Sequence, residues 1–343
     1  MKILFIKLSS IGDLVHTLPA YHALEKKLRS VYPQLEIDWL VYDKLAPILE
    51  KSIDSKRLIR VKRDFIALMQ KALELKGEYD HVLDLQGLLK TALMSKIIQT
   101  KSNYGFKKPR EKLASSFYKD SFCDYESLYA KKHVVDQNME LVSSFYQYLT
   151  KHVYEFEEIN FKIPYHEAYS NNKKKLCLIP ATTWESKHWS IKNWTRLLAS
   201  IKDADKEGNI EFFMTGSSAD QDYLQNIAMS SVRKIEIITD KKLPELYEFY
   251  QKMDIVIGVD TGPLHIAAAA NYDKRDSKTI IGLYGPSSGL RSQPYGFDYV
   301  SVDELTGKKA SNKKTSEADD YSIEKLTPGM VLAKLSLGSE LKV

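Results

Sequence analysis

The sequence contains little cysteine and no long hydrophobic run. Its 343 residues include two cysteines, Cys123 and Cys177, which lie far apart and form no CxxC pair. This excludes a zinc site built from cysteines and argues against a disulfide framework. No apolar stretch approaches the roughly 18 residues of a membrane-spanning helix, and Lys7 and Asp13 interrupt the N-terminal apolar run too early for a signal-peptide core. We therefore expect a cytoplasmic protein.

Motifs of several common enzyme classes are also missing. The sequence has no GxGxxG, no GxxxxGK[ST], no GxSxG and no HExxH, which argues against a dinucleotide oxidoreductase, a P-loop NTPase, a serine hydrolase and a zincin. Two DxD strings, at 203–205 and 220–222, could indicate a metal-dependent transferase. The first falls at the end of an expected helix, and DxD arises easily by chance when 28% of residues are charged. We expect no obligatory metal ion or cofactor.

Positive charge is in excess, and only in the first half of the chain. The net charge is +5, and residues 1–165 hold 26 Lys and Arg against 21 Asp and Glu, whereas the remainder is balanced. Two stretches, 56–63 and 101–112, concentrate the excess. Such stretches fit an anionic partner, which could be nucleic acid, a phosphorylated substrate or an acidic membrane surface. They fit a solvated face equally well.

The sequence does contain an alternation of strand and helix patterns, typical of parallel sheets with helical crossovers. The pattern restarts near residue 165, so we predict two α/β halves, in line with the length. Strands are expected at 2–8, 35–42, 79–86, 174–181, 210–216, 234–239, 254–260 and 279–285. Helices are expected at 16–31, 65–76, 128–150 with Ser127 as N-cap, 190–204 with Ser190 as N-cap, 244–252 and 328–336. The polar segment 304–325 is expected to be a mobile loop.

Ligands of such domains bind at the carboxyl ends of the strands, so the loops that follow strands are the candidate site. The first such loop contains Ser10, Gly12 and Asp13. Gly12 permits a close backbone approach or a positive φ. Asp13 near a helix N-terminus has two interpretations: Asp13 or Ser10 caps the helix, or Asp13 is a general base whose ionised form the helix favours.

The loop at Asp260, Thr261 and Gly262 follows another strand and opens a helix at Pro263. Backbone N–H groups at such a start form an anion site suited to a pyrophosphate, to which Thr261 adds a hydroxyl and His265 a ring nitrogen. Asp260 would repel a phosphate, so it either caps the helix or accepts hydrogen bonds from a ligand hydroxyl.

Two further loops of the second half carry polar residues. Thr182, Thr183 and Lys187 leave the strand at 174–181 together, and Lys187 can neutralise a phosphate, whereas Trp189 is expected to be a packing anchor. Asp220 starts a helix, where a carboxylate can bind ribose hydroxyls or cap the helix. The loops suited to a phosphorylated ligand thus lie in the second half, and the candidate base and the basic stretches lie in the first. This division suggests that the second half binds a nucleotide-type donor and the first half an acceptor.

Five segments in register resemble the lipopolysaccharide heptosyltransferases of glycosyltransferase family 9, and the SSIGD and HTLPA combination is most similar to the heptosyltransferase I branch. The segments are MKILFIKLSSIGDLVHTLPA at the start, DLQGLLKTAL (84–93), PREKLASSFY (109–118), ATTWESKHW (181–189) and VDTGPLHIAAA (259–269). The resemblance covers nearly the whole chain up to about residue 290. Segments 271–278 and 304–325 depart from the family pattern.

The resemblance implies a GT-B fold, with an acceptor domain at 1–165, a nucleotide-sugar domain at 166–325, and a C-terminal helix and tail at 326–343 that pack back on the body. It implies inverting transfer of L-glycero-D-manno-heptose from ADP-heptose, as co-substrate, to a Kdo residue of lipid A. Asp13 matches the catalytic base. Thr182, Thr183, Lys187, Asp220, Asp260, Thr261, Gly262 and His265 match donor-binding positions, although Asp220 stands where the family usually has glutamate.

On the acceptor side, Lys90 and Arg110 match basic positions of the family, and Ser10, Gly12, Lys62 and Arg63 complete the acceptor site that we expect. Lys187 is expected to stabilise the leaving diphosphate as well as to bind it. An anionic Kdo–lipid A acceptor suits the basic first half and predicts a peripheral protein on the inner face of the cytoplasmic membrane, with no nucleic-acid partner. Two alternatives remain: a family member with another acceptor, such as a capsule sugar or a protein, and a nucleotide-sugar-binding protein without catalysis.

Overall fold

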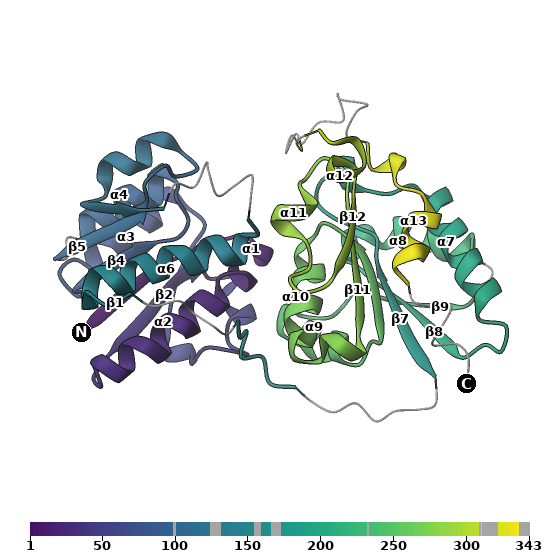
Figure 1. Cartoon of the computed structure of the whole chain (residues 1–343), viewed down its shortest axis with the longest axis horizontal. Helices are drawn as coiled ribbons and strands as arrows, with labels where there is room; N and C mark the ends of the chain where they lie inside the picture. Colours follow the sequence, from purple (N-terminus) through teal and green to yellow (C-terminus); the bar gives the residue numbers. More distant parts are fainter. Residues whose placement is uncertain are drawn as a thin grey trace. The chain divides into compact units, whose positions relative to one another are not determined.

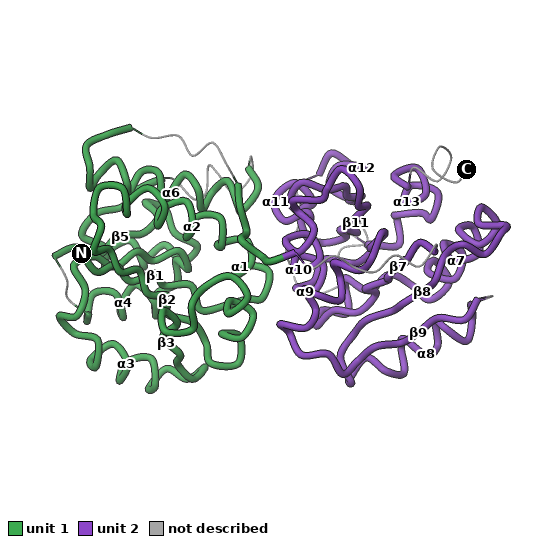
Figure 2. The backbone as a smooth tube through the Cα atoms, turned by 90° about the horizontal axis from the view of Figure 1, so that it is seen from below, with its two compact units in different colours: residues 1–164 green, residues 165–343 purple. Residues whose placement is uncertain are grey.

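The computed structural model describes residues 1–98, 101–123, 132–153, 159–165, 173–231, 233–308, 310 and 322–335. The chain divides into two compact units, Met1–Pro164 and Tyr165–Val343 (Figure 2). Each unit contains one six-stranded parallel sheet with helices around it (Figure 1). The described helices include none that is long and apolar enough to cross a bilayer.

The sheet of unit 1 has the strand order β3-β2-β1-β4-β5-β6. Its central strands are short apolar runs, and β1 is buried at four of its five residues. The strands are β1 (Lys2–Ile6), β2 (Glu36–Tyr42), β3 (Leu58–Val61), β4 (His81–Asp84), β5 (Ser102–Phe106) and β6 (Asp120–Phe122). The helices are α1 (Ile11–Val15), α2 (Leu18–Val31), α3 (Phe65–Glu74), α4 (Leu89–Ile98), α6 (Val134–Thr150) and the 3₁₀ segment η3 (Lys112–Phe117).

The sheet of unit 2 repeats this arrangement, with the order β12-β11-β10-β7-β8-β9. The strands are β7 (Lys174–Ile179), β8 (Ile210–Thr215), β9 (Ile235–Ile238), β10 (Ile255–Val259), β11 (Thr279–Tyr284) and β12 (Asp298–Ser301). The helices are α7 (Ile191–Ala204), α8 (Gln221–Met229), α9 (Leu243–Gln251), α10 (Gly262–Asn271), α11 (Gly289–Ser292), α12 (Val302–Thr306) and α13 (Pro328–Lys334). The 3₁₀ segments include η4 (Glu185–Lys187) and η6 (Tyr272–Ser277).

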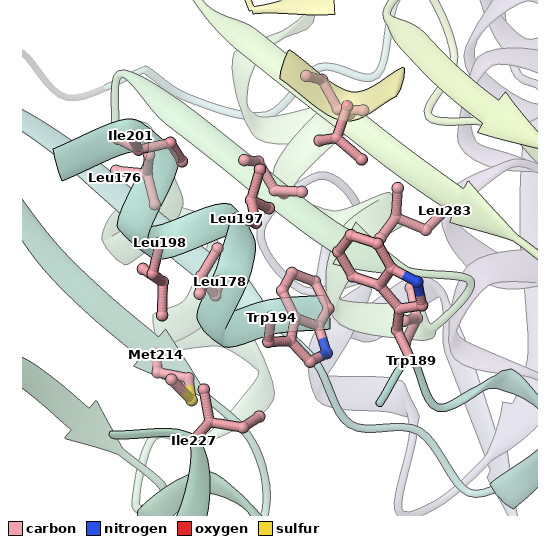
Figure 3. Close-up of a cluster of buried hydrophobic side chains, with 14 of the residues drawn as sticks. Leu176, Leu178, Trp189, Trp194, Leu197, Leu198, Ile201, Met214, Ile227 and Leu283 are labelled. Atoms are coloured by element: carbon pink, nitrogen blue, oxygen red, sulfur yellow. The ribbon is translucent and has the colours of Figure 1, made fainter. Parts of the chain in front are cut away.

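The core of unit 2 is built around two tryptophans (Figure 3). Trp189 and Trp194 are fully buried and pack edge to face, with ring centroids 5.0 Å apart. The indole N–H of Trp189 donates a hydrogen bond to the Leu326 carbonyl oxygen at 3.0 Å, and Leu326, Val331 and Leu335 belong to the same core. The prediction that Trp189 is a packing anchor is confirmed, and the segment around α13 is fixed to the body of unit 2.

Most predicted elements are present, but two boundaries were wrong. The helix predicted from 128 begins at Val134, and its N-cap is His133, whose ring nitrogen accepts from the Val135 N–H; Ser127 lies outside the described residues. The helix predicted from 16 is preceded by α1, which contains Gly12. Gly12 therefore has helical backbone angles and not a positive φ.

Strands β3, β5, β6 and β12 were missed because they are short and carry polar residues, such as Arg60 in β3. Three of these strands, β3, β6 and β12, lie at the edges of their sheets, where no continuous apolar run is needed because an edge is covered less fully than the centre. Strand β5 is buried along its length, but its sequence SNYGF begins with two polar residues and contains a glycine. The polar segment 304–325 was predicted to be a mobile loop, but its residues 304–306 belong to α12 and its residues 323–325 form a 3₁₀ turn. Residues 309 and 311–321 of that segment lie outside the described residues.

Candidate functional site

The order of strands reverses once in each sheet, and the candidate residues lie at these reversal points. In unit 2 the reversal falls between β7 and β10, and in unit 1 between β1 and β4. Crossovers leave on opposite faces at such a point, which opens a crevice at the carboxyl ends of the two strands. The loops after β7 and β10 hold Lys187 and Asp260, and the loops after β1 and β4 hold Asp13 and Gln86.

Asp260, directly after β10, forms a buried ionic cluster with residues of both loops. Lys187 Nζ lies 2.5 Å from its Oδ2, and His265 Nε2 lies 3.5 Å from its Oδ1. Burial alone would raise the pKa of this carboxyl, but the charge of Lys187 and the hydrogen bond from His265 outweigh burial and hold the pKa well below its ordinary value. Asp260 is therefore an anion at neutral pH, and it fixes Lys187 and His265 beside one another.

The loop that carries Lys187 is fixed by its own aromatic and polar contacts. Lys187 Nζ lies 4.5 Å from the centre of the Trp184 ring, and the Thr182 hydroxyl donates to the Asp260 carbonyl oxygen at 3.5 Å. His188 Nε2 lies 2.8 Å from the Thr182 carbonyl oxygen, and its ring stacks on Tyr223 with centroids 5.0 Å apart. Thr183 is exposed at the tip.

The start of α10 completes this group of residues. Thr261 is the N-cap and Pro263 lies in the first turn. The interpretation that Asp260 caps this helix is wrong, because its carboxylate bonds to Lys187 and His265 instead. One lysine, one histidine and the first N–H groups of α10 thus lie together with hydroxyls of Thr182 and Thr261, which is the donor set that binds a diphosphate.

Asp220 lies beyond the end of β8, the strand next to β7. Its carboxylate accepts hydrogen bonds from the backbone N–H of Ser217 at 2.8 Å and from the Ser217 hydroxyl at 2.6 Å. This is a capping box at the start of the turn that leads into α8. The capping interpretation is therefore confirmed; a ribose contact stays a prediction.

Asp13 of unit 1 has the same local arrangement. Its Oδ2 accepts from the backbone N–H and from the hydroxyl of Ser10, each at 3.0 Å, which forms a capping box at the start of α1. The Asp13 side chain is half-buried, Ser10 is exposed and Gly12 is buried. The capping interpretation is confirmed here too, and it is compatible with a base, because donors to a carboxylate favour its ionised form.

Gln86 links the loops after β4 and β1, a role that sequence reasoning missed although the residue lies in the segment DLQGLLKTAL (84–93). Its Oε1 accepts from the backbone N–H of Leu8 at 2.9 Å and of Ser9 at 3.3 Å, immediately before the Ser10–Asp13 box. Asp84, fully buried, accepts from the Gln86 and Gly87 N–H groups and from the Tyr118 hydroxyl. Burial raises the pKa of Asp84 above its ordinary value.

The predicted acceptor residues Lys62, Arg63, Lys90 and Arg110 lie near the carboxyl ends of β3, β4 and β5. Lys90 Nζ donates to the Tyr42 hydroxyl at 2.9 Å, and the Arg63 guanidinium lies 6.0 Å from the centre of the same ring. Lys62, Arg63 and Arg110 are exposed. The structure thus brings Arg63 and Lys90 together on Tyr42, a residue that sequence reasoning missed.

Part of the basic charge predicted to meet an anionic partner is neutralised within unit 1. Arg57 bonds to Glu36 and Asp38 at 3.0 and 3.2 Å. Arg60 pairs with Glu50, and Lys101 with Asp80. For these three residues the solvated-face interpretation holds.

Within the residues that the structure describes, no group of three or more His, Cys, Asp and Glu side chains could hold a metal ion. One carboxylate of each DxD string has other partners: Asp205 accepts from the N–H groups of Asn209 and Ile210 and pairs with Arg233, and Asp220 caps its turn.

The chain is similar to known heptosyltransferases along its length. It is 28% identical to lipopolysaccharide heptosyltransferase 1 of Campylobacter coli over 94% of both chains. It is 24% identical to the protein of the same name from Escherichia coli (strain K12), and that alignment spans 98% of this chain and 99% of the E. coli protein. Residues 67–322 match the family model of glycosyltransferase family 9 (heptosyltransferase).

Solved structures confirm the predicted fold class. The structure of E. coli heptosyltransferase WaaC with ADP superimposes with a TM-score of 0.71 at 21% identity, covering 99% of this chain and 98% of that one. A family 9 glycosyltransferase from Veillonella parvula superimposes with a TM-score of 0.77 at 16% identity, covering 97% and 96%. The two parallel sheets are thus those of the GT-B fold, and since the family model spans most of the sequence, the chain belongs to glycosyltransferase family 9 and is a heptosyltransferase.

Proposed function

We propose that this enzyme transfers L-glycero-D-manno-heptose from ADP-heptose to a Kdo residue of lipid A, a step of lipopolysaccharide inner-core synthesis. The observation that carries the proposal is the Lys187–Asp260–His265 cluster beside the start of α10, an arrangement suited to a diphosphate. Curated relatives are named lipopolysaccharide heptosyltransferases, and WaaC structures contain ADP or ADP-2-deoxy-2-fluoro heptose.

In unit 2 the donor diphosphate lies on the N–H groups of Thr261 and Gly262, with Lys187 and His265 at its oxygens. A carboxylate at this position would repel the diphosphate, but the charge of Asp260 is offset by Lys187 at 2.5 Å. Asp260 then acts on the donor through the two side chains it holds. Thr182 and Thr183 contact the phosphates or the sugar, and Asp220 contacts the ribose by exchanging a Ser217 hydrogen bond for a ribose hydroxyl.

The reaction is a single inverting displacement. The acceptor hydroxyl attacks the anomeric carbon of the heptose while the bond from that carbon to the diphosphate oxygen breaks, and ADP leaves. Asp13 takes the hydroxyl proton, which later passes to water. Lys187 and the N–H groups of α10 stabilise the negative charge that develops on the leaving diphosphate.

The acceptor lies on unit 1, where Ser10 and Gly12 line the Asp13 loop and Lys62, Arg63, Lys90 and Arg110 face its anionic groups. Charge of this kind suits a Kdo carboxylate and lipid A phosphates at the inner face of the cytoplasmic membrane. Neither nucleic acid nor a protein-held metal enters this proposal.

The test is ADP release from ADP-heptose with Kdo–lipid A as acceptor, comparing the wild type with Asp13→Ala. We expect acceptor-dependent release by the wild type and its collapse in the variant, while donor binding measured by calorimetry is unchanged. Donor binding without release would show that the acceptor is another sugar or a protein. Absence of donor binding would refute the assignment of the nucleotide sugar.

A further inference from the structure

Exposed apolar side chains of unit 1 gather where α3, α4 and η3 begin. Phe65 and Ile66, in the first turn of α3, are 55% and 66% exposed, and Leu113, in η3, is 69% exposed. Leu89, the first residue of α4, is 38% exposed. Helix α3 buries Leu68 and Ala72 instead. We call Phe65, Ile66, Leu89 and Leu113 the apolar rim.

Contacts of α4 with each of the other two segments bring the apolar rim together. Arg63 and Lys90 lie over the same Tyr42 ring, at 6.0 and 5.5 Å from its centre, which places the start of α3 beside the start of α4. The Leu89 N–H donates to a Glu111 carboxylate oxygen at 2.6 Å, which places η3 beside α4. The apolar rim therefore lies among Lys62, Arg63, Lys90 and Arg110, which we call the basic cluster.

We propose that the apolar rim is the membrane-docking surface of the enzyme and inserts into the interface of an anionic bilayer, with the basic cluster at the lipid headgroups. The inference rests on the proposed function, because a lipid-borne acceptor has to be reached at a bilayer. Single exposed apolar residues are ordinary on soluble proteins. Large apolar side chains interleaved with cations on one edge are the combination by which peripheral proteins bind anionic membranes.

Leu73 provides a way to distinguish a bilayer from a protein partner, whereas the basic cluster is what favours an anionic bilayer as the occupant. Leu73 is 62% exposed and lies seven residues beyond Ile66 on α3, which is about 10 Å along a helix axis. A partner helix lying along α3 would cover Ile66 and Leu73 together. A bilayer approached edge-on would take up the rim and leave Leu73 in water.

The experiment is vesicle co-sedimentation of the full chain, with vesicles of phosphatidylcholine alone or with phosphatidylglycerol. We expect the wild type to bind the anionic vesicles and the double variant Phe65→Asp/Ile66→Asp, or Leu113→Asp, to bind them at least tenfold more weakly. Acidic residues in the first turn of α3 are compatible with its fold, since they favour a helix N-terminus. Leu73→Asp on the same helix and Met229→Asp in unit 2, where Met229 is 80% exposed, are the matched controls and should bind like the wild type.

ADP release with an acceptor that lacks acyl chains separates this inference from the proposed function. The neutral variants Phe65→Ser/Ile66→Ser and Leu113→Ser, which add no negative charge beside the basic cluster, should bind vesicles weakly and retain wild-type turnover on that acceptor. Equal vesicle binding by rim variants and wild type would overturn the inference. An equal loss with Leu73→Asp would overturn it too, because the loss would then come from the added negative charge and not from the position of the apolar rim. A wild type that turns over the soluble acceptor but binds no vesicles would refute the docking surface and leave the proposed function intact.

Discussion

Each unit has one reversal of strand order with a carboxylate beside it, but the two carboxylates have different surroundings. In unit 2, Asp260 is buried between Lys187 and His265, and its pKa is held well below the ordinary value. In unit 1, Asp13 is half-buried and bonded to the amide and hydroxyl of Ser10. A carboxylate locked in an ion pair with a lysine holds that cation in place and is a poor proton acceptor. In the proposed function, Asp260 therefore organises the anion-binding side chains of unit 2, and Asp13 takes the proton in unit 1.

The same substitution made in both units gives the largest expected difference. Asp13→Asn keeps the capping oxygen but removes the proton acceptor, so kcat should fall by roughly 10²- to 10⁴-fold with unchanged donor affinity. Asp260→Asn should act on donor affinity instead, because Lys187 and His265 lose the anion that holds them. Steady-state kinetics with donor calorimetry on both variants is the measurement. Similar profiles for the two variants would contradict the division of roles.

Removing Lys187 tests whether Asp260 depends on its partner. Lys187→Ala leaves a buried anion without its main counter-charge, a change that typically costs about 3–5 kcal/mol of unfolding free energy. The double variant Lys187→Ala/Asp260→Asn removes the anion as well and should recover part of this loss in urea unfolding. No recovery would mean that the loss comes from the packing of Lys187 on Trp184 and not from the ion pair.

The pH dependence of the same pair has a definite sign. Because the pKa of Asp260 is lowered in the folded state, its contribution to stability is complete above the ordinary Asp pKa of about 3.9 and is lost as the pH falls below that value. The stability difference between wild type and Asp260→Asn should be constant from neutral pH down to about that pKa and shrink in more acid solution. A difference that did not change with pH would be inconsistent with an ionised Asp260.

Gln86 tests whether the Asp13 loop has to be held from β4. Gln86→Leu leaves the Leu8 and Ser9 N–H groups without their acceptor, and the resulting displacement of the Asp13 loop should lower kcat by about tenfold, within the range known for misplaced catalytic groups. Gln86→Glu retains an acceptor oxygen and should restore most of the activity. The affinity for the donor, which the proposed function places on unit 2, should equal that of the wild type in both variants. A change in donor affinity would argue for a general folding defect.

The two capping boxes should give the smallest effects. Ser10→Ala and Ser217→Ala each remove a hydroxyl donor from a carboxylate and should lower the unfolding free energy by about 1 kcal/mol. Ser10→Ala should also lower kcat, whereas Ser217→Ala should change only the donor affinity. If the two variants changed the same kinetic parameter, the proposed division of roles between the two units would be wrong.

The sequence predicted the central strands and the loops that follow them, because buried parallel strands are continuous apolar runs that end in polar residues. It placed Lys187 and Asp260 in candidate loops but not in one ion pair, since they are 73 residues apart and only the pairing of β10 with β7 brings them together. Gln86 and Tyr42 were missed for a related reason. Their roles depend on neighbouring strands and loops. Gln86 lies in the family segment DLQGLLKTAL, but that resemblance pointed to Lys90 and not to Gln86.

The hydrogen bond from Trp189 to the Leu326 carbonyl has a consequence for the order in which the protein forms during translation. Unit 1 consists of residues 1–164, so its sheet can assemble while the ribosome is still making unit 2. The core of unit 2 includes Leu326, Val331 and Leu335, so the loop that carries Lys187 lacks its support until those residues have emerged. A nascent chain would therefore hold the complete sheet of unit 1 long before the loop that carries Lys187 is supported in unit 2.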